Sequence, residues 1–204
     1  MEKFKNNKYE VGIDEAGRGP FFGPVYAAAV IWGNAPDNEM IKDSKKLSKK
    51  KRKEALEWIK ENVKAYGVGC CSSQEIDQYG ILNATKKAME KAINNIELIP
   101  KKSKYKLLID GIGWEKMEFE TTLPKIEIES VVKGDAHFRN IAAASILAKE
   151  AHDHHIDQLC SDNNDLDEKY DLLSNKGYGT KKHIEGIKKH GLSEFHRHSF
   201  NINY

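Results

Sequence analysis

Long apolar runs are missing from this sequence of 204 residues. No segment reaches the ~20 consecutive apolar residues that a membrane-spanning helix needs. The first ten residues, Met1 to Glu10, carry charges throughout and lack the apolar centre of a secretory signal. The sequence therefore predicts a soluble protein of the cytoplasm that has no membrane partner and is long enough to bury one sizeable core.

Cysteine is scarce as well, with only Cys70, Cys71 and Cys160. The first two are neighbours in the sequence and are poorly placed to bridge each other. An odd count does not indicate a disulfide framework either. We therefore expect reduced, buried thiols.

A large net charge of one sign is also absent, because 33 basic residues stand against 31 acidic ones and the formal net charge is +2. A net charge this small does not by itself indicate nucleic-acid binding. Basic residues nevertheless occupy seven of the nine positions from Lys45 to Lys53. A solvated helix face is the ordinary interpretation of such a run, and a phosphate-facing patch is the alternative.

Alternating apolar residues, turn signals and helical spacing predict an α/β fold with a mixed sheet, helices on its faces and a helical C-terminal part. The expected strands are Tyr9–Ile13, Val25–Trp32, Ala65–Cys71, Tyr105–Asp110 and Ile126–Val132. The expected helices are Ser48–Val63, Ser72–Ile96 with a break near Gly80, Phe138–Leu159 and Thr180–His190. We expect residues 1–160 to form the core and residues 161–204 to form a helical segment packed on it, as one continuous domain.

Four carboxylates lie at or just beyond the ends of predicted strands: Asp14, Glu15, Asp110 and Asp135. Strand ends can meet at one rim of a mixed sheet, but two carboxylates ~4 Å apart repel by ~4 kcal/mol at an effective dielectric near 20. Such a cluster stays ionised only around a cation, and oxygen-only ligands favour Mg²⁺ or Mn²⁺. Two such ions would activate a water and stabilise the leaving oxygen of a phosphodiester. The cluster therefore predicts a catalytic metal site for nuclease or nucleotidyl-transfer chemistry.

Taken singly, a carboxylate at a strand end is more often a turn residue or a surface charge. The adjacent Asp14 and Glu15 are harder to explain in that way, because glycines follow them at once. Consecutive strand residues face opposite sides of a sheet. Both side chains can serve one site only if the chain turns at Glu15, and Gly17 and Gly19 permit that turn.

The segment Val11–Val30, with its run Asp-Glu-Ala-Gly-Arg-Gly-Pro, resembles the signature of ribonuclease HII, the type 2 ribonuclease H. Further motifs of that family follow in its order and span nearly the whole chain. They are Asp43–Leu47, Leu108–Gly111, Lys133–Asp135, Ala142–Lys149, Gly177–Thr180 with His183, and His196–Phe200. The resemblance implies a ribonuclease H-like fold and an endoribonuclease that hydrolyses the RNA strand of RNA/DNA hybrids.

The same resemblance implies cleavage on the 5′ side of ribonucleotides embedded in duplex DNA, with two metal ions and with 3′-hydroxyl and 5′-phosphate products. Asp14, Glu15, Asp110 and Asp135 would be the catalytic carboxylates that hold the metals. The substrate-binding residues that it implies are Gly17, Arg18, Gly19, Lys45, Lys46 and Tyr178. The three residues from Gly17 would sense the 2′-hydroxyl, and Tyr178 would pack against the neighbouring deoxyribose. We expect the enzyme to act as a monomer.

Three departures from the family pattern stand out. Ile112 replaces a frequent asparagine, and Glu150–Asp153 replaces a more usual Val-Thr-Arg-Asp, which removes an arginine and keeps the aspartate. The C-terminal extension that carries partner-binding motifs in some relatives is not expected here. If residues 138–153 form one helix, Asp153 lies roughly 20 Å beyond its start, so we expect Asp135 and not Asp153 to bind metal.

Histidines gather near the ends of the last two helices. We expect His152, His154 and His155, together with Asp153 and Asp157, to lie on an exposed polar helix end, because their spacing scatters them around a helix. For His183, His196, Arg197 and His198 two alternatives remain open, contact with the nucleic-acid backbone or packing of the C-terminal segment. No histidine is needed as a general base if metals activate the water.

Three other functions remain as alternatives to this one. A DNA nuclease or strand-transfer enzyme on the same fold would use similar carboxylates. A catalytically silent hybrid-binding protein would have the same fold and bind the duplex without cutting it. Ribonuclease HIII is a nearer relative, but it usually carries an extra N-terminal domain, and here the motif begins at Val11.

Overall fold

The computed structural model describes residues 9–42, 44, 47–97 and 104–202. Its centre is a mixed sheet of five strands in the order β3-β2-β1-β4-β5. The strands are β1 (Glu10–Ala16), β2 (Val25–Ile31), β3 (Ala65–Cys71), β4 (Lys104–Asp110) and β5 (Lys125–Val131). β1 pairs antiparallel with β2 and parallel with β4, so the carboxyl ends of β1 and β4 lie at the same edge.

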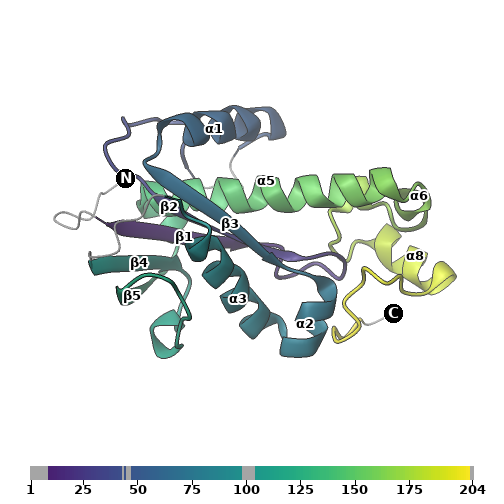
Figure 1. The fold of residues 1–204 in the computed structure, drawn as a ribbon. Coiled ribbons are helices and arrows are strands. Elements are labelled where there is room, and N and C mark those ends of the chain that lie inside the picture. Colours follow the sequence, from purple (N-terminus) through teal and green to yellow (C-terminus); the bar gives the residue numbers. More distant parts are fainter. Residues whose placement is uncertain (1–8, 43, 45–46, 98–103, 203–204) are drawn as a thin grey trace.

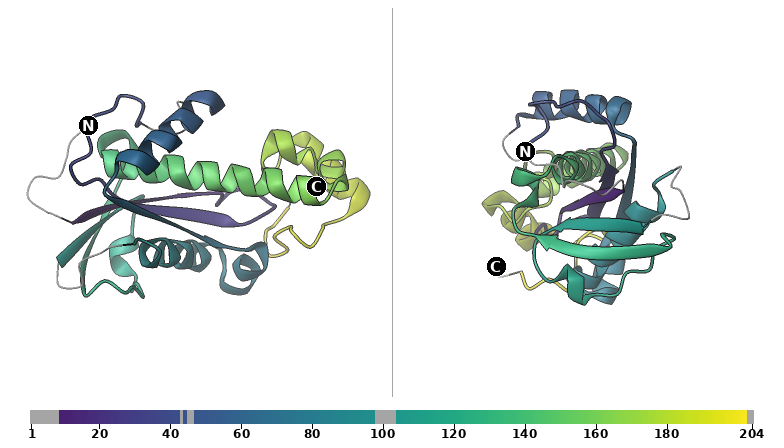
Figure 2. Two further views of the ribbon diagram at one scale, coloured as in Figure 1. Left: turned by 45° about the horizontal axis from the view of Figure 1, so that its top comes forward. Right: turned by 90° about the vertical axis from the view of Figure 1, so that its left-hand side faces the viewer.

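Helices cover both faces of this sheet (Figure 1). One face packs against α3 (Ile81–Asn94), and the other packs against α5 (Arg139–Asp162), with α1 (Lys49–Asn62) outside α5. The right-hand view of Figure 2 shows the sheet edge-on between these helices. Side chains alternate between the two cores: Ala27 and Ala29 face the α3 side, whereas Ala28 and Val30 face the α5 side.

Close contact between β1 and α5 requires a glycine in the strand. A Cβ atom on Gly12 would lie 2.4 Å from the backbone carbon of Asn140 and 2.5 Å from the backbone nitrogen of Ile141. The alanines Ala142–Ala144, which are fully buried, extend this close packing along the helix. The small side chains therefore hold the start of α5 directly against the strand that carries Asp14.

The predicted helix starts are confirmed. Ser48 caps α1 by accepting from the N–H of Lys51, and Ser72 forms a capping box with Glu75 at the start of α2 (Ser73–Tyr79). The predicted break falls at Gly80, whose φ of 75° separates α2 from α3.

The C-terminal part contains α6 (Asp165–Tyr170), α7 (Leu172–Asn175) and α8 (Lys181–His190), which form a small core with Phe22, Ile156 and Cys160. α5 runs through residue 160, so the expected division at 160 and 161 falls inside this helix. Two shorter helical elements complete the fold, the 3₁₀ turn at Trp114–Lys116 and α4 (Gly134–His137). In the part of the chain that the structure describes, no helix is long and apolar enough to cross a membrane.

Candidate active site

Asp14 and Glu15 lie inside β1, and the chain does not turn at Glu15 as the sequence had suggested. Both residues pair with β2, opposite Ala28 and Ala27, and the turn begins at Gly17 with a φ of 87°. The prediction placed the turn too early, because the ladder with β2 holds the backbone extended to Ala16. Glu15 instead reaches the site from the end of the strand, where its carboxylate accepts from Arg18 Nη1 at 3.2 Å.

Asp110 ends β4, and Asp135 follows β5 in the single turn of α4. The Oδ1 atom of Asp110 accepts a hydrogen bond from the N–H of Gly134 at 2.6 Å. This bond joins the end of β4 to the start of α4, beside the buried Asp135. Parallel pairing of β1, β4 and β5 thus brings the four predicted carboxylates to one edge of the sheet.

The carboxylates of this edge act on one another electrostatically. Burial raises the pKa of Asp14 well above its usual value, and the charges of Glu15 and Asp110 raise it further. Burial also raises the pKa of Glu15, although Arg18 opposes this shift. Asp14 Oδ1 accepts from the N–H of Glu15 at 2.7 Å. Three acids of the predicted set therefore lie within electrostatic reach of each other.

The donor chemistry of these residues fits a hard divalent cation. All four are oxygen ligands, and the Oε2 atom of Glu15 is buried with no hydrogen-bond partner among the described residues. A cation would satisfy that atom and lower the pKa of Asp14. No three acidic, histidine or cysteine side chains of the described chain already converge closely enough to hold an ion. The side chains would have to close around the metal.

The two predicted elements for ribonucleotide recognition lie beside each other. A Cβ atom on Gly19 would be 3.4 Å from the Tyr178 ring. Tyr178 is 43% exposed, and Arg18 and Gly19 are exposed as well. The Nζ atom of Lys149 lies 5.9 Å from the centre of the Tyr178 ring. Gly19 and Tyr178, which are 159 positions apart in the sequence, thus form one surface next to Glu15.

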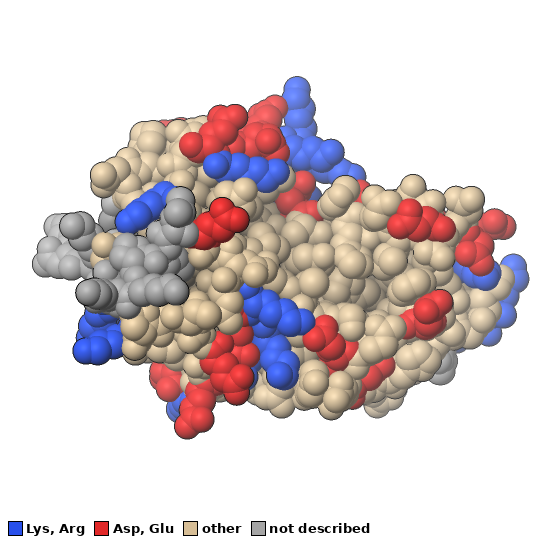
Figure 3. Space-filling model, viewed as in Figure 1, with Lys and Arg blue, Asp and Glu red and all other residues tan. Residues whose placement is uncertain are grey.

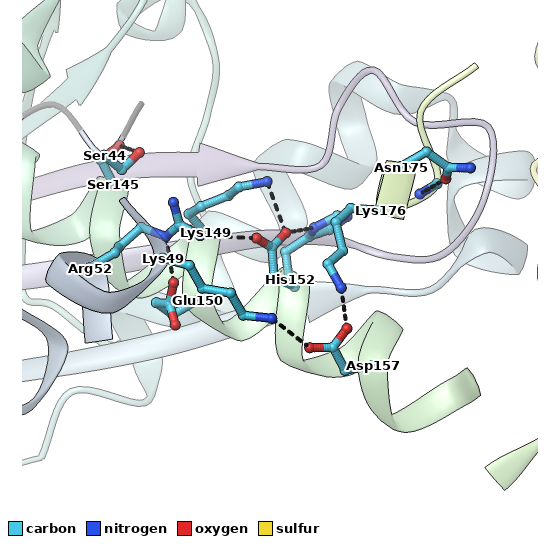
Figure 4. A network of polar contacts seen from close by, with 12 residues as sticks. Ser44, Lys49, Arg52, Ser145, Lys149, Glu150, His152, Asp157, Asn175 and Lys176 are labelled. Carbon is cyan, nitrogen blue, oxygen red and sulfur yellow. Dashed lines mark hydrogen bonds and ion pairs between the residues drawn. The ribbon is translucent and has the colours of Figure 1, made fainter. Parts of the chain in front are cut away.

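The prediction of an exposed polar end for α5 is wrong at two positions. His152 is fully buried and Asp153 is 7% exposed, while His154 alone of the three histidines is exposed. Lys149 and Arg52 lie 2.8 and 3.4 Å from the Asp153 carboxylate, and Arg52 also pairs with Glu150 (Figure 4). The C-terminal elements and α1 cover this end of α5, which the spacing within the helix did not reveal.

His152 also touches the loop of residues 17–24 between β1 and β2, which we call the recognition loop. A Cβ atom on Gly17 would lie 2.4 Å from Cδ2 of His152, so this position accepts only glycine without rearrangement. The Nε2 atom of His152 has no hydrogen-bond partner among the described residues. Burial opposes ionisation of Asp153, but hydrogen bonds from His152 and Lys149 and the charge of Lys149 lower its pKa to about 2. Asp153 is thus already paired with protein groups, and its place outside the metal site stays a prediction.

The open question about the C-terminal motif is answered in favour of packing for three of its four residues, whereas His198 is exposed. His183, His196 and Arg197 are fully buried. Arg197 donates to backbone carbonyls between Gly17 and Pro24, and His183 contacts both the Tyr178 carbonyl and His196. Sequence reasoning left these residues without a role, and the only signal was their place in a matched motif.

Lys45 and Lys46 lie outside the described residues. Of the same basic run, Lys49, Lys50, Lys51 and Lys53 are exposed on α1, whereas Arg52 is directed inward to Glu150 and Asp153. On the face shown in Figure 3, acidic and basic side chains are interspersed. The thiols of Cys70, Cys71 and Cys160 are free; Cys71 and Cys160 are buried as expected, and Cys70 is partly exposed.

Acidic residues gathered at one edge of a mixed sheet are typical of metal-dependent enzymes that cut phosphodiesters. The family model for ribonuclease HII matches residues 11–203. The chain is 44% identical to the ribonuclease HII of Clostridioides difficile over 96% of its own length and 71% of that protein. It is 40% identical to the enzyme of Pelagibacter ubique, over 95% and 96% of the two chains. The chain belongs to the ribonuclease HII family and is a metal-dependent endoribonuclease.

Solved structures share this ribonuclease H-like fold. The ribonuclease H2 of Pyrococcus horikoshii superposes with a TM-score of 0.67 at 22% identity, covering 94% of this chain and 93% of that one. The ribonuclease HII in the PCNA complex of Archaeoglobus fulgidus gives 0.70 at 22% identity, with 96% of each chain covered. Bst-RNase HIII with Mn²⁺ gives 0.64 at 18% identity, and only 64% of that longer chain is covered.

Proposed function

We propose that Asp14, Glu15, Asp110 and Asp135 together bind two Mg²⁺ or Mn²⁺ ions and that the enzyme cuts on the 5′ side of a ribonucleotide. The unpartnered, buried Glu15 Oε2 beside Asp14 and Asp110 is the observation that carries this proposal. When bound, the ions supply an activated water and a stabilised leaving oxygen, which gives 3′-hydroxyl and 5′-phosphate ends. A structure with Mn²⁺ is known for Bst-RNase HIII.

The chain's own groups bind and orient the nucleic acid. Gly17, Arg18 and Gly19 contact the ribose, and the backbone comes close because no Cβ intervenes at the glycines. The Tyr178 ring packs on the deoxyribose that follows, where a 2′-hydroxyl would collide. This assignment is supported by the contact between Gly19 and Tyr178 and by the exposure of both. Lys45, Lys46 and the exposed lysines of α1 hold phosphates without reading sequence.

The substrates that we propose are RNA/DNA hybrids and DNA duplexes that contain ribonucleotides. We further propose that the enzyme acts as a monomer in the cytoplasm. A DNA nuclease or a strand-transfer enzyme would not need a surface that recognises a ribose. A silent hybrid-binding protein would not need four acids at one edge.

The test uses a DNA duplex with a single ribonucleotide, a long RNA/DNA hybrid and an all-DNA duplex, each with Mg²⁺ or Mn²⁺. We expect the intact protein to cut the first two and to leave the third intact, and Asp14→Asn to lose at least a hundredfold in rate. Cleavage of the all-DNA duplex at an equal rate would exclude ribose recognition. No cleavage of any substrate with either metal would leave only the silent binding protein.

A further inference from the structure

The segment after α8 runs back along the recognition loop. Phe22 and His196 form an isolated bridge, the N–H of Gly23 donates to Phe195 O at 2.9 Å, and the N–H of Arg197 donates to Phe21 O at 2.8 Å. Residues close to the C-terminal end of the fold thus lie beside the turn that leaves β1. Two side chains of this segment, His196 and Arg197, are completely buried.

The guanidinium of Arg197 donates to four backbone carbonyls. Its Nε donates to Gly23 O at 2.9 Å, and its Nη1 donates to Arg18 O at 3.0 Å. Its Nη2 donates to Gly17 O at 2.6 Å and to Pro24 O at 3.0 Å. Burial lowers the pKa of Arg197 to about 10, so the group stays charged at neutral pH. A buried charge is costly unless its donors are satisfied, and here four carbonyls and the Phe200 ring, 5.1 Å away, surround it.

These contacts fix the direction of the recognition loop. In a trans peptide the C=O of one residue and the N–H of the next point in opposite directions. Because the carbonyls of Gly17 and Arg18 both point to the buried guanidinium, the N–H groups of Arg18 and Gly19 point away from it. Arg18 and Gly19 are exposed. The guanidinium therefore presents two adjacent donors on the outer side of the loop.

His196 makes a comparable connection to Tyr178. The N–H of Ser193 donates to Nδ1 of His196 at 2.9 Å, so the proton of this ring is on Nε2. That Nε2 donates to Nε2 of His183 at 3.1 Å, which leaves the His183 proton on Nδ1. His183 Nδ1 then donates to the carbonyl of Tyr178 at 2.9 Å. Burial lowers the pKa of both rings, that of His196 to about 3, so both are neutral at physiological pH.

We propose that Arg197 and His196 are positioning residues for ribonucleotide recognition, Arg197 for the donors of Arg18 and Gly19 and His196, through His183, for Tyr178. The inference rests on the proposed roles of Gly17, Arg18, Gly19 and Tyr178. Neither positioning residue touches substrate. The adjacent His196 and Arg197 thus fix Tyr178 and the recognition loop relative to each other.

The test compares variants on the single-ribonucleotide duplex and the long hybrid, with Mn²⁺ binding and thermal unfolding measured in parallel. Arg197→Lys keeps the charge but cannot reach four carbonyls, so we expect kcat/KM to fall at least tenfold on both substrates while Mn²⁺ affinity is unchanged. His196→Leu breaks the chain of hydrogen bonds to Tyr178, so we expect at least a tenfold loss on the single-ribonucleotide duplex and at most a threefold loss on the hybrid. His196→Gln, whose amide can replace the lost donor, should restore most of the activity.

Tyr170→Phe is the matched control, because it removes the hydrogen bond from Tyr170 to Gly191 O in the same C-terminal part and keeps the ring that packs on His183 and His196. We expect it to lower the Tm and leave the ratio of the two substrates unchanged. The inference would be overturned if kcat/KM of Arg197→Lys stayed within twofold of the wild-type value. It would also be overturned if His196→Leu lost the same fraction of kcat/KM on both substrates. The same pattern in Tyr170→Phe, or weaker Mn²⁺ binding in the variants, would also overturn it by showing a general loss of structure. Failure of the wild type to cut either substrate would instead refute the proposed function.

Discussion

Two buried aspartates of this protein should respond in opposite ways to removal of their charge. Asp14 faces the charges of Glu15 and Asp110, whereas Asp153 faces Lys149 and Arg52. Both side chains are nearly inaccessible, at 6% and 7% exposure. We expect Asp14→Asn to stabilise the metal-free protein and Asp153→Asn to destabilise it.

The size of each effect follows from the charges around the group. Two carboxylates ~5 Å apart at an effective dielectric near 20 repel by about 3 kcal/mol. Relaxation and weakened hydrogen bonds offset part of this, so Asp14→Asn should raise the free energy of unfolding by about 1 to 3 kcal/mol. For Asp153, a pKa lowered from 3.8 to about 2 corresponds to about 2 kcal/mol of stability.

The pH dependence has a defined sign for each group. The folded protein holds the Asp14 proton more tightly than the unfolded chain does, so metal-free stability should rise as the pH falls from 8 toward the unfolded pKa. Asp14→Asn should lack this rise in stability with falling pH. The Asp153 contribution is complete above the unfolded pKa and is lost only as the pH falls toward about 2, so the defect of Asp153→Asn should be constant between pH 5 and 8.

Thermal unfolding in a chelator, repeated with Mn²⁺, measures both effects. At ~2 to 4 °C per kcal/mol for a chain of this size, Asp14→Asn should unfold about 2 to 12 °C above the wild type without metal. Mn²⁺ should raise the Tm of the wild type more than that of the variant, because only the wild type keeps all four proposed ligands. If Asp14→Asn unfolds below the wild type in the chelator, the acids of this edge do not repel one another as described.

Three further substitutions test the site and its support. Gly17→Ala places a side chain at φ 87° and against His152, so we expect a loss of at least 2 kcal/mol in stability and a larger fractional loss of ribonucleotide cleavage; an active, equally stable variant would contradict the close contact. Tyr178→Ala should lose more activity on the single-ribonucleotide duplex than on a long hybrid, and equal losses would argue against junction sensing. Gly12→Ala should destabilise the fold by about 2 kcal/mol or more, because overpacking typically costs ~1–3 kcal/mol and the new Cβ would meet backbone atoms of α5. A chemical denaturation midpoint equal to that of the wild type would show that α5 can shift away from β1.

The fold was predictable because its local signals agree with one another. Alternation marked the first strand and short apolar segments marked the other four, while Ser48, Ser72 and Gly80 marked helix boundaries that the structure reproduces. The four carboxylates were found because each lies at a strand end or just after one, and parallel pairing brings such ends together. The turn after Glu15 was misplaced, because cross-strand pairing with β2 and not the local sequence decides where β1 ends.

The support behind the site was not predictable in the same way. Arg197 meets carbonyls 173 to 180 positions earlier in the chain, and backbone acceptors leave no mark on the sequence. Asp153 was expected on a solvated helix end because the helical spacing considers only one element, whereas Arg52 reaches it from α1. Charged residues of this kind look like surface residues until the partner element is known.

The four bonds of Arg197 also set an order of assembly. Strand β1 and its acids are made first, yet the carbonyls of Gly17 and Arg18 gain their donors only when residue 197 has been synthesised. Contacts that close so long a loop form late, since the entropy of closure must be overcome before they contribute. A nascent chain can therefore contain all four acids of the sheet edge and still lack the donors that hold the turn at Gly17 and Arg18, so we expect activity only after residue 197 has been made.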